Sequence, residues 1–335
     1  MNDKFLSKSF LEAAEILKNS KNIIITTHMN PDGDAIGSAL GLYHYANELG
    51  CNAEVIINDE VPYNFLFLPD ASKIRQYNDV DHQKQIKAAD ALFVVDLNDT
   101  TRLKDMEQAI LESNAKKIVI DHHIDPKDFA DVYIVDTEAS SAGELIYKFL
   151  VSIDINLLNK KASESLYTAI MTDSGNFRFP RTDSELHRIV ADLIDKGADP
   201  VAIYNDVYAK VPFRKMRLLG IAYSNMNLYF NGKLLVMYLT SDNLQEADAN
   251  DNDVEDFVET LLKVDGVQIG ILLTEAIDKS VIRISFRSKG DYSVRDIALK
   301  FGGGGHFHAA GARVYNSDIQ QVQHSVLEEI SAYFN

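Results

Sequence analysis

Short apolar runs, each followed by an acidic residue or a histidine, set the pattern of the first half of the chain. The runs cover residues 23–25, 91–95 and 118–120. They are rich in β-branched residues and too short for helices, so they predict buried strands. Helical patterns at 35–49 and at about 102–112 separate these runs. Alternation of helices with fully apolar strands predicts an α/β fold with a mostly parallel sheet.

The second half of the chain predicts a smaller α/β domain. Strand-like runs cover residues 234–239, 267–274 and 281–286. Before them, the segments at about 182–196 and 200–225 predict helices that connect the two domains.

A length of 335 residues is sufficient for two hydrophobic cores. We therefore predict a first domain at 1–196, a helical connection at 197–225 and a second domain at 226–335.

Composition narrows the functional classes. Hydrophobic residues make up 46% of the chain and charged residues 25%, as in soluble globular proteins. No apolar stretch is long enough to cross a bilayer, so no membrane association and a cytoplasmic location are expected. Cys51 is the only cysteine, which excludes a disulfide within the chain and a thiolate metal cluster.

The charge balance points away from long nucleic acids. The chain has 50 acidic residues against 33 Lys and Arg, a net charge of −17. Proteins that bind long nucleic acid normally need a basic face, because contacts to phosphates supply much of the affinity. We therefore expect no long duplex as partner. A short anionic substrate, held by bound cations and a few arginines, remains compatible with this composition.

Candidate chemistry begins just after the first apolar run, in the sequence Thr-His-Met-Asn-Pro-Asp-Gly-Asp at 27–34. Pro31 disfavours a helical conformation at the preceding residue, so His28, Asp32 and Asp34 should lie on a loop. That loop follows a strand, where open α/β sheets bind ligands. An imidazole and two carboxylates suit a divalent transition metal. An ordinary turn, with Asp34 capping the next helix, is the alternative.

The other two apolar runs end in the same way. One is followed by Asp96, the other by Asp121, His122 and His123, and Asp173 lies near the end of a later predicted helix. The carboxyl ends of parallel strands share one edge of a sheet, so the residues that follow them should gather there.

A glycine-rich segment marks the second domain. Residues 302–305 are four consecutive glycines, whose backbone N–H groups can approach an anion closely. Between Lys279 and Arg313 there are seven Lys or Arg and two Asp. A flexible linker is the alternative, although the flanking residues look ordered. The acidic stretch at 242–259 is interpreted as a helix start with a favourable dipole interaction, not as a calcium site.

In combination, these motifs resemble the DHH phosphoesterase superfamily, and within it the stand-alone branch of nano-RNases and pAp phosphatases. The matching pieces are residues 27–34, 94–96, 121–123 and 172–175. The segment at 302–311 is similar to the DHH-associated C-terminal domain. The resemblance implies a catalytic first domain that binds metal, a second domain that binds substrate, and an active site in the cleft between them.

The resemblance also implies a set of site residues and two divalent metal ions, usually Mn²⁺ in this family. One metal would be held by His28, Asp32 and Asp96, and the second by Asp34, Asp96, His122 and Asp173, with Asp96 bridging. His123 would face the substrate phosphate, and Asp121 would orient its neighbours. Substrate would be bound by Arg287, Gly303, Gly304, Gly305 and His306.

The implied activity is hydrolysis of short oligoribonucleotides to mononucleotides and of pAp to AMP. A phosphodiesterase for pApA, pGpG or cyclic-di-AMP is the alternative within the superfamily, although this sequence shows none of the membrane and sensor segments of the membrane-bound branch. The segment at 302–311 argues against a family II pyrophosphatase. A nucleotide-binding regulator without turnover is disfavoured, because the metal-ligand set is complete. Association of two copies is left open.

Overall fold

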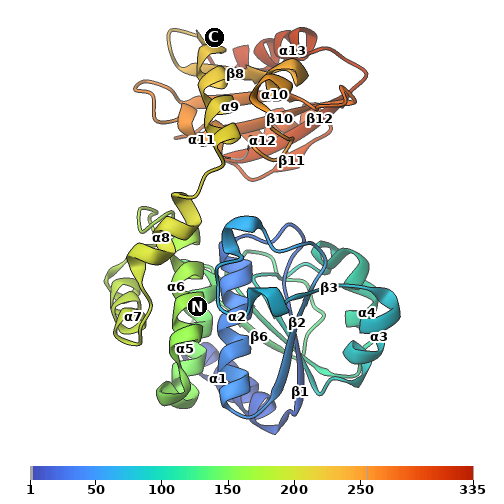
Figure 1. Cartoon of the computed structure of the whole chain (residues 1–335), viewed down its shortest axis with the longest axis vertical. Coiled ribbons are helices and arrows are strands. Elements are labelled where there is room, and N and C mark those ends of the chain that lie inside the picture. Colours follow the sequence, from blue (N-terminus) through green and yellow to red (C-terminus); the bar gives the residue numbers. More distant parts are fainter. Residues whose placement is uncertain (1–2, 255, 335) are drawn as a thin grey trace. The chain divides into compact units, whose positions relative to one another are not determined.

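The structure is a computed structural model that describes residues 3–254 and 256–334. It divides into two compact units, Met1–Lys210 and Val211–Asn335 (Figure 1). The division falls inside 197–225. Helix α8, Pro200–Tyr208, belongs to unit 1, and α9, Phe213–Ser224, belongs to unit 2. A continuous helix at 200–225 is therefore wrong, and the break lies where Pro212, which has no N–H to donate, precedes α9.

Unit 1 contains a six-stranded sheet in which every pair of neighbouring strands is parallel. In spatial order the strands are β3 (Arg75–Gln76), β2 (Asn52–Ile57), β1 (Asn22–Thr26), β4 (Ala91–Val95), β5 (Lys116–Asp121) and β6 (Val132–Val135). The chain proceeds from β1 to one side of the sheet and then crosses to β4 on the other. At such a switch, open α/β sheets bind ligands beyond the carboxyl ends of the strands.

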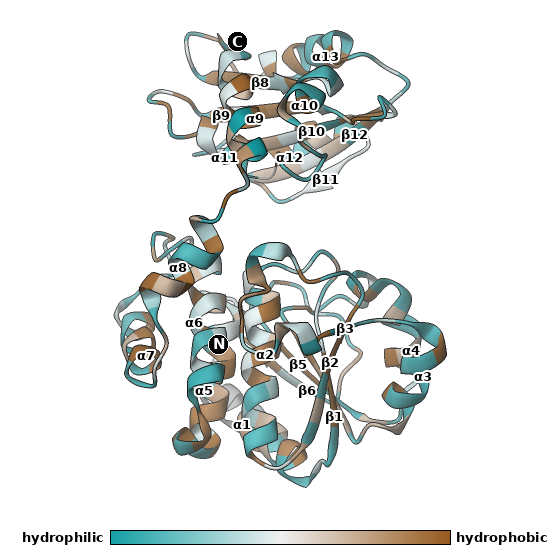
Figure 2. Cartoon of the chain, viewed as in Figure 1, coloured by the Kyte–Doolittle hydropathy of each residue, from teal (hydrophilic) through white to brown (hydrophobic). Residues whose placement is uncertain are grey.

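Helices cover both faces of this sheet, as its fully apolar strands require. One face carries α1 (Asp3–Asn19), α2 (Gly33–Glu48) and α5 (Ala142–Asp154), and α6 (Lys160–Asp173) and α7 (Ser184–Asp195) pack on these helices. The other carries α3 (Asp79–Ala88), the 3₁₀ helix η3 (Thr100–Met106) and α4 (Glu107–Glu112). Short 3₁₀ turns lie at Tyr63–Phe65, Ala71–Lys73 and Ile155–Leu157. Figure 2 shows the apolar strands enclosed by helices.

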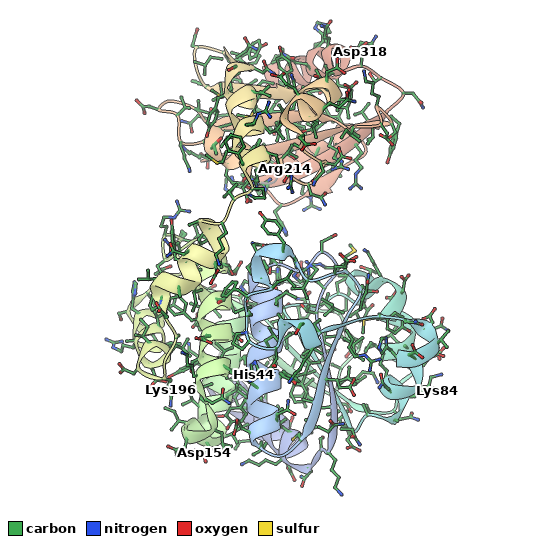
Figure 3. The ribbon with its side chains drawn as sticks, viewed as in Figure 1. His44, Lys84, Asp154, Lys196, Arg214 and Asp318 are labelled. Carbon is green, nitrogen blue, oxygen red and sulfur yellow. The ribbon has the colours of Figure 1, made fainter. Side chains whose placement is uncertain are left out.

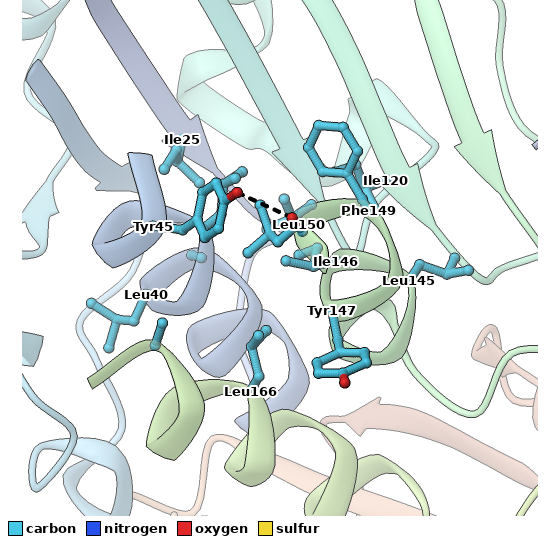
Figure 4. Packing of buried hydrophobic residues seen from close by; sticks show 14 of the residues in the cluster. Ile25, Leu40, Tyr45, Ile120, Leu145, Ile146, Tyr147, Phe149, Leu150 and Leu166 are labelled. Carbon is cyan, nitrogen blue, oxygen red and sulfur yellow. Dashed lines mark hydrogen bonds between the residues drawn. The ribbon is translucent and has the colours of Figure 1, made fainter. Parts of the chain in front are cut away.

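Alternate strand residues supply the two cores. Ile23 and Ile25 pack into the core beneath α2 and α5, whereas Ile24 faces the opposite core. In the first core, the Tyr45 hydroxyl of α2 donates a hydrogen bond to the Leu150 carbonyl oxygen of α5 at 3.1 Å (Figure 4). The helix predicted at 102–112 is only partly correct. Lys104 has a φ of +47°, which interrupts the segment before α4 begins.

Unit 2 is built on a mixed six-stranded sheet. In spatial order the strands are β11 (Gly304–Gly305), β12 (Ala309–Tyr315), β10 (Val281–Ser288), β9 (Ile269–Glu275), β8 (Leu234–Leu239) and β7 (Met226–Tyr229). Only β8 and β9 are parallel neighbours within the described residues. One face packs against α12 (Val294–Lys300) and α13 (Ile319–Ser331), and the other against α9, α10 (Ser241–Ala247) and α11 (Phe257–Leu261).

The glycine run is an ordered part of this sheet. Gly304 and Gly305 form β11 and pair with Gly311 and Ala310 of β12. A Cβ atom on Gly303 would collide with the Gly311 carbonyl, and Gly305 has a φ of +139°. The alanine- and glycine-rich residues that follow the run form strand β12. Pairing with β10 outweighs the low strand propensity of alanine and glycine.

Charged side chains surround both units, including the labelled Lys84 on α3 and Asp318 at the start of α13 (Figure 3). Among the residues that the structure describes, no helix is both long and apolar enough to cross a membrane.

Candidate metal centre

The site residues predicted in unit 1 come together at the carboxyl edge of its sheet. His28 follows β1, Asp96 follows β4, and the segment Asp121-His122-His123 begins at the last residue of β5. Asp32 and Asp34 lie at the start of α2, and Asp173 is the last residue of α6. Segments up to 145 residues apart in sequence thus contribute to one cluster.

Asp96 lies at the centre of the cluster. Its Oδ2 is 3.2 Å from His28 Nε2, and its Oδ1 is 3.6 Å from His122 Nε2. The residue is buried and has a φ of +55°, a conformation that aspartate tolerates better than most residues. Its N–H donates to the Ile120 carbonyl at 2.9 Å, which fixes the turn after β4 against β5. The two oxygens therefore face different histidines.

Asp34 joins the cluster to the start of α5. Its carboxylate accepts hydrogen bonds from the Ala142 and Gly143 N–H groups, at 2.7 and 2.9 Å, and from the Ser38 hydroxyl at 2.9 Å. The prediction that Asp34 caps α2 is wrong. Asp32 is the cap and accepts from the Ala35 N–H at 3.0 Å. Asp34 instead satisfies free N–H groups in the first turn of another helix.

Close packing of α2 on α6 places Asp34 near Asp173. A Cβ atom on Gly37 would lie 2.5 Å from the Ser165 carbonyl oxygen, so only glycine permits this approach. His122 Nε2 lies 3.8 Å from Asp34 Oδ2 and 3.4 Å from Asp173 Oδ2. Packing of the two helices therefore sets the spacing of two carboxylates around one imidazole.

The remaining histidines are oriented by hydrogen bonds. His28 Nδ1 lies 2.8 Å from the Met29 carbonyl oxygen, which directs Nε2 at Asp96. His123 Nδ1 is 2.7 Å from Asp121 Oδ1, and Asp121 is fully buried. His123 is the more exposed partner, so its ring is held at one end while the rest can face solvent.

Mutual repulsion and burial perturb the titration of the cluster. Burial, followed by the Asp96 carboxylate, raises the pKa of Asp173 to about 6 against the opposing charge of His122. Burial also raises the pKa of Asp34, with further contributions from Asp96 and Asp173. For His122, burial opposes protonation, but the carboxylates of Asp96, Asp34 and Asp173 outweigh it and raise the pKa to about 10. The cluster favours bound positive charge.

The donor atoms fit metal binding. Three groups have donor atoms that all lie within 4.8 Å of one another: His28, Asp32 and Asp96; Asp34, His122 and Asp173; and Asp96, His122 and His123. Asp96 Oδ1 and Asp121 Oδ2 are buried and accept no hydrogen bond from any described residue. Imidazole nitrogens mixed with carboxylate oxygens suit a divalent transition metal. The residues present therefore fit divalent cations, and Asp96 belongs to two of the three donor groups.

The predicted substrate-binding residues all lie in unit 2. Arg287 is on β10, where its guanidinium Nε and Nη2 contact Glu259 Oε1 at 2.9 and 2.8 Å. Gly303 precedes β11, which Gly304 and Gly305 form. His306 is exposed in the turn that follows, where its N–H donates to the Ala309 carbonyl at 2.7 Å.

Two features of the site were missed by the sequence analysis. Ser38, one turn after Asp34 on α2, holds the Asp34 carboxylate. Glu259 pairs with Arg287 from a distant part of the chain. The i, i+4 spacing of Asp34 and Ser38 was a usable signal, whereas nothing in the sequence links Glu259 to Arg287.

Comparison with known proteins places this site in a family. The model described as "DHH family, N-terminal domain" matches residues 22–171, and the model described as "DHHA1 domain" matches residues 231–335. A bifunctional oligoribonuclease and PAP phosphatase NrnA from Thermus thermophilus is 32% identical, over 95% of this chain and 92% of that protein. The chain belongs to the DHH family. Its members are metal-dependent phosphoesterases, which confirms the predicted class of enzyme.

Two further proteins are similar to this chain over most of its length. The bifunctional oligoribonuclease and PAP phosphatase NrnA of Bacillus subtilis is 29% identical, over 88% of this chain and 90% of that protein. A solved structure of an exopolyphosphatase-related protein from Bacteroides fragilis matches with a TM-score of 0.94 and 30% identity. The structural match covers 100% of this chain and 99% of the Bacteroides fragilis chain, which confirms the predicted α/β fold.

Proposed function

We propose that this chain hydrolyses short oligoribonucleotides to mononucleotides and converts pAp to AMP, with two divalent metal ions as cofactors. The observation that carries the proposal is the arrangement around Asp96, whose two carboxylate oxygens face histidines from two different donor groups. The names of the relatives from Thermus thermophilus and Bacillus subtilis support the choice of substrates.

In this proposal, one metal is held by His28, Asp32 and Asp96, and the other by Asp34, Asp96, His122 and Asp173. When bound, two divalent cations activate water and stabilise the charge that develops on a phosphoryl group. Mn²⁺ is the proposed metal, because nitrogen donors accompany the carboxylates and thiolates are absent from the described cluster.

The chain's own residues orient the site and contact the substrate. Asp121 fixes the ring of His123 through a 2.7 Å contact, so that the exposed part of the ring can donate a hydrogen bond to a phosphate oxygen. Asp34 remains in place through hydrogen bonds from α5 and Ser38, which do not depend on any bound ligand. Such outer contacts preserve ligand orientation and typically influence metal affinity strongly.

Unit 2 supplies recognition in the same proposal. Arg287 presents a planar guanidinium suited to phosphate. The Gly303 N–H already donates to the Ala298 carbonyl at 2.9 Å, whereas Gly304 and Gly305 have no side chain to keep a phosphate from the backbone. Arg287 is already held by Glu259, so little side-chain entropy remains to be lost on binding. His306 is exposed and can act as a further donor.

A substrate panel tests the proposal. The full-length protein is assayed with Mn²⁺ on pAp, pApA, pGpG, cyclic-di-AMP and single-stranded RNAs of 2 to about 24 nucleotides. We expect hydrolysis of pAp and of RNAs of a few nucleotides, with efficiency falling for longer strands because added phosphates meet an acidic surface. Hydrolysis of cyclic-di-AMP alone, or a preference for the longest RNA, would contradict the proposed substrates.

A further inference from the structure

Three arginines share one face of the sheet in unit 2. Arg283 and Arg287 lie on the same face of β10, because every second residue of a strand points the same way. Arg313 of β12 is paired in register directly opposite Arg283. Like charges placed directly opposite each other across two strands are destabilising. This face therefore needs counter-charges.

The acidic stretch at 242–259, which includes residues of α10 and α11, supplies most of them. Glu259 pairs with Arg287, and Asp251 contacts Arg283, with Oδ2 at 3.5 Å from Nη2 and its carbonyl accepting from Nη1 at 3.1 Å. Asp253 pairs with Arg214 of α9, labelled in Figure 3, at 2.8 Å. The stretch is thus more than a helix start: its carboxylates neutralise the arginines of this unit.

Arg313 is the exception on this face. Its side chain is exposed and makes no hydrogen bond or ion pair with any residue that the structure describes. Its neighbour Arg283 also has an unsatisfied donor, since Nε is buried and finds no acceptor in the described part of the chain. The charge of Arg313 therefore has no partner among the described residues, and Arg283, although paired with Asp251, keeps one donor free.

A cavity of about 480 Å³ opens at this place. Its walls include Arg283, Ser285, Gly302, Gly303, Arg313 and Tyr315, and none of its lining residues is acidic. In a chain with a net charge of −17, a cavity lined by two arginines, of which only Arg283 has a carboxylate partner, is a local reversal of sign. Tyr315 adds an aromatic ring that is 60% exposed.

We propose that this cavity is a nucleotide subsite for single-stranded RNA, distinct from the Arg287 contact. Arg313 and Arg283 hold a backbone phosphate, the Ser285 hydroxyl supplies a further donor, and a base stacks on Tyr315. Binding sites for single strands combine positive charge with aromatic stacking in this way. This subsite rests on the proposed function, since its ligand is a nucleotide of the same substrate.

The spacing along β10 determines which substrates can reach the subsite. Arg283 and Arg287 are four residues apart, which corresponds to about 13 Å along a strand. In pAp the two phosphates flank a single ribose, so a molecule held by Arg287 does not extend to Arg313. An RNA of several nucleotides does. The subsite therefore strengthens binding of short RNA and leaves pAp unaffected.

Binding of a fluorescent pentaadenylate to the full-length protein in EDTA tests this, with anisotropy measured across a range of salt concentrations. Arg313→Gln should lower affinity about tenfold, as expected for a charge-assisted contact. It should also reduce the slope of log K against log salt by about 0.7, the value for one phosphate contact to a single strand. Arg295→Gln is the matched control, because Arg295 is an exposed arginine of α12 outside the cavity lining.

Tyrosine variants and turnover complete the test. Tyr315→Phe should bind normally because the ring remains, whereas Tyr315→Ala should weaken binding. With Mn²⁺, Arg313→Gln should reduce kcat/KM for the pentanucleotide and not for pAp. If Arg313→Gln and Arg295→Gln have the same affinity for pentaadenylate, or if Arg313→Gln lowers kcat/KM for pAp as much as for the pentanucleotide, the proposed subsite is wrong. Absence of RNA cleavage by the unaltered protein would instead refute the proposed function, while the binding measurement would still decide the subsite.

Discussion

Substitution of Gly37 by alanine tests whether helix packing sets the geometry of the metal centre. The new Cβ would lie 2.5 Å from the Ser165 carbonyl oxygen and 2.8 Å from the Ala169 backbone nitrogen. Both are backbone atoms of α6, so no side-chain rotation can relieve the collision. Ordinary contact begins near 3.4 Å, so α2 and α6 must separate locally by about 0.9 Å.

Two opposing effects determine the change in stability. Alanine is a better helix former than glycine by up to about 1 kcal/mol. Overpacking of a tight interface costs about 1–3 kcal/mol. Because the obstacles are rigid, we expect Gly37→Ala to lower the free energy of unfolding of unit 1 by about 1–2 kcal/mol, measured by urea denaturation with circular dichroism.

The same displacement should weaken metal binding. Asp34 is on α2 and Asp173 is on α6, and metal–ligand distances tolerate only about 0.2 Å of error. Calorimetric titration with Mn²⁺ should therefore show at least one site weakened tenfold or more. Gly220→Ala on α9 is the control, since a Cβ there meets no atom within 4 Å. It should be neutral or slightly stabilising and leave Mn²⁺ binding unchanged. Unaltered stability and metal affinity in Gly37→Ala would refute the argument that this contact sets the site.

Two other predictions concern charge. The surrounding carboxylates hold the pKa of His122 at about 10 despite its burial, so metal-free protein carries a proton there at pH 7 that a metal must displace. Mn²⁺ affinity should therefore increase about tenfold per pH unit between pH 7 and 9, and a pH-independent titration would contradict this. Arg287→Ala should leave Mn²⁺ binding intact and reduce kcat/KM for pAp about ten- to hundredfold, through loss of a contact of about 1.5–3 kcal/mol. Hydrolysis of bis-p-nitrophenyl phosphate should be unchanged. An equal loss of kcat/KM for both substrates would exclude a role of Arg287 in binding pAp.

The parts of the fold that depend on the local pattern of apolar and polar residues could be predicted from the sequence. Runs such as 91–95 are apolar throughout because helices cover both faces of the sheet, and their ends marked Asp96 and Asp121 as neighbours. The pattern did not reveal β2, whose first half is polar, or β12, which is rich in alanine and glycine. Both strands depend on pairing with neighbours that are distant in sequence.

Local rules also failed at the site itself. Asp34 has the position of a helix cap by sequence, yet its carboxylate reaches the first turn of α5, more than 100 residues away. The acidic stretch at 242–259 was interpreted as a helix start, and only the folded structure shows that its Asp251 and Glu259 pair with Arg283 and Arg287. Contacts of this kind follow from tertiary structure and leave no periodic signal.

Asp96→Ala tests whether Asp96 is shared by two metal ions that act together. The variant is purified, its fold is checked by circular dichroism, and Mn²⁺ content and hydrolysis of pAp are measured beside the unaltered protein. We expect two Mn²⁺ ions per chain in the unaltered protein, weakened binding of both in the variant, and a loss of turnover of several powers of ten. A folded Asp96→Ala protein with near-normal turnover would contradict this shared role of Asp96.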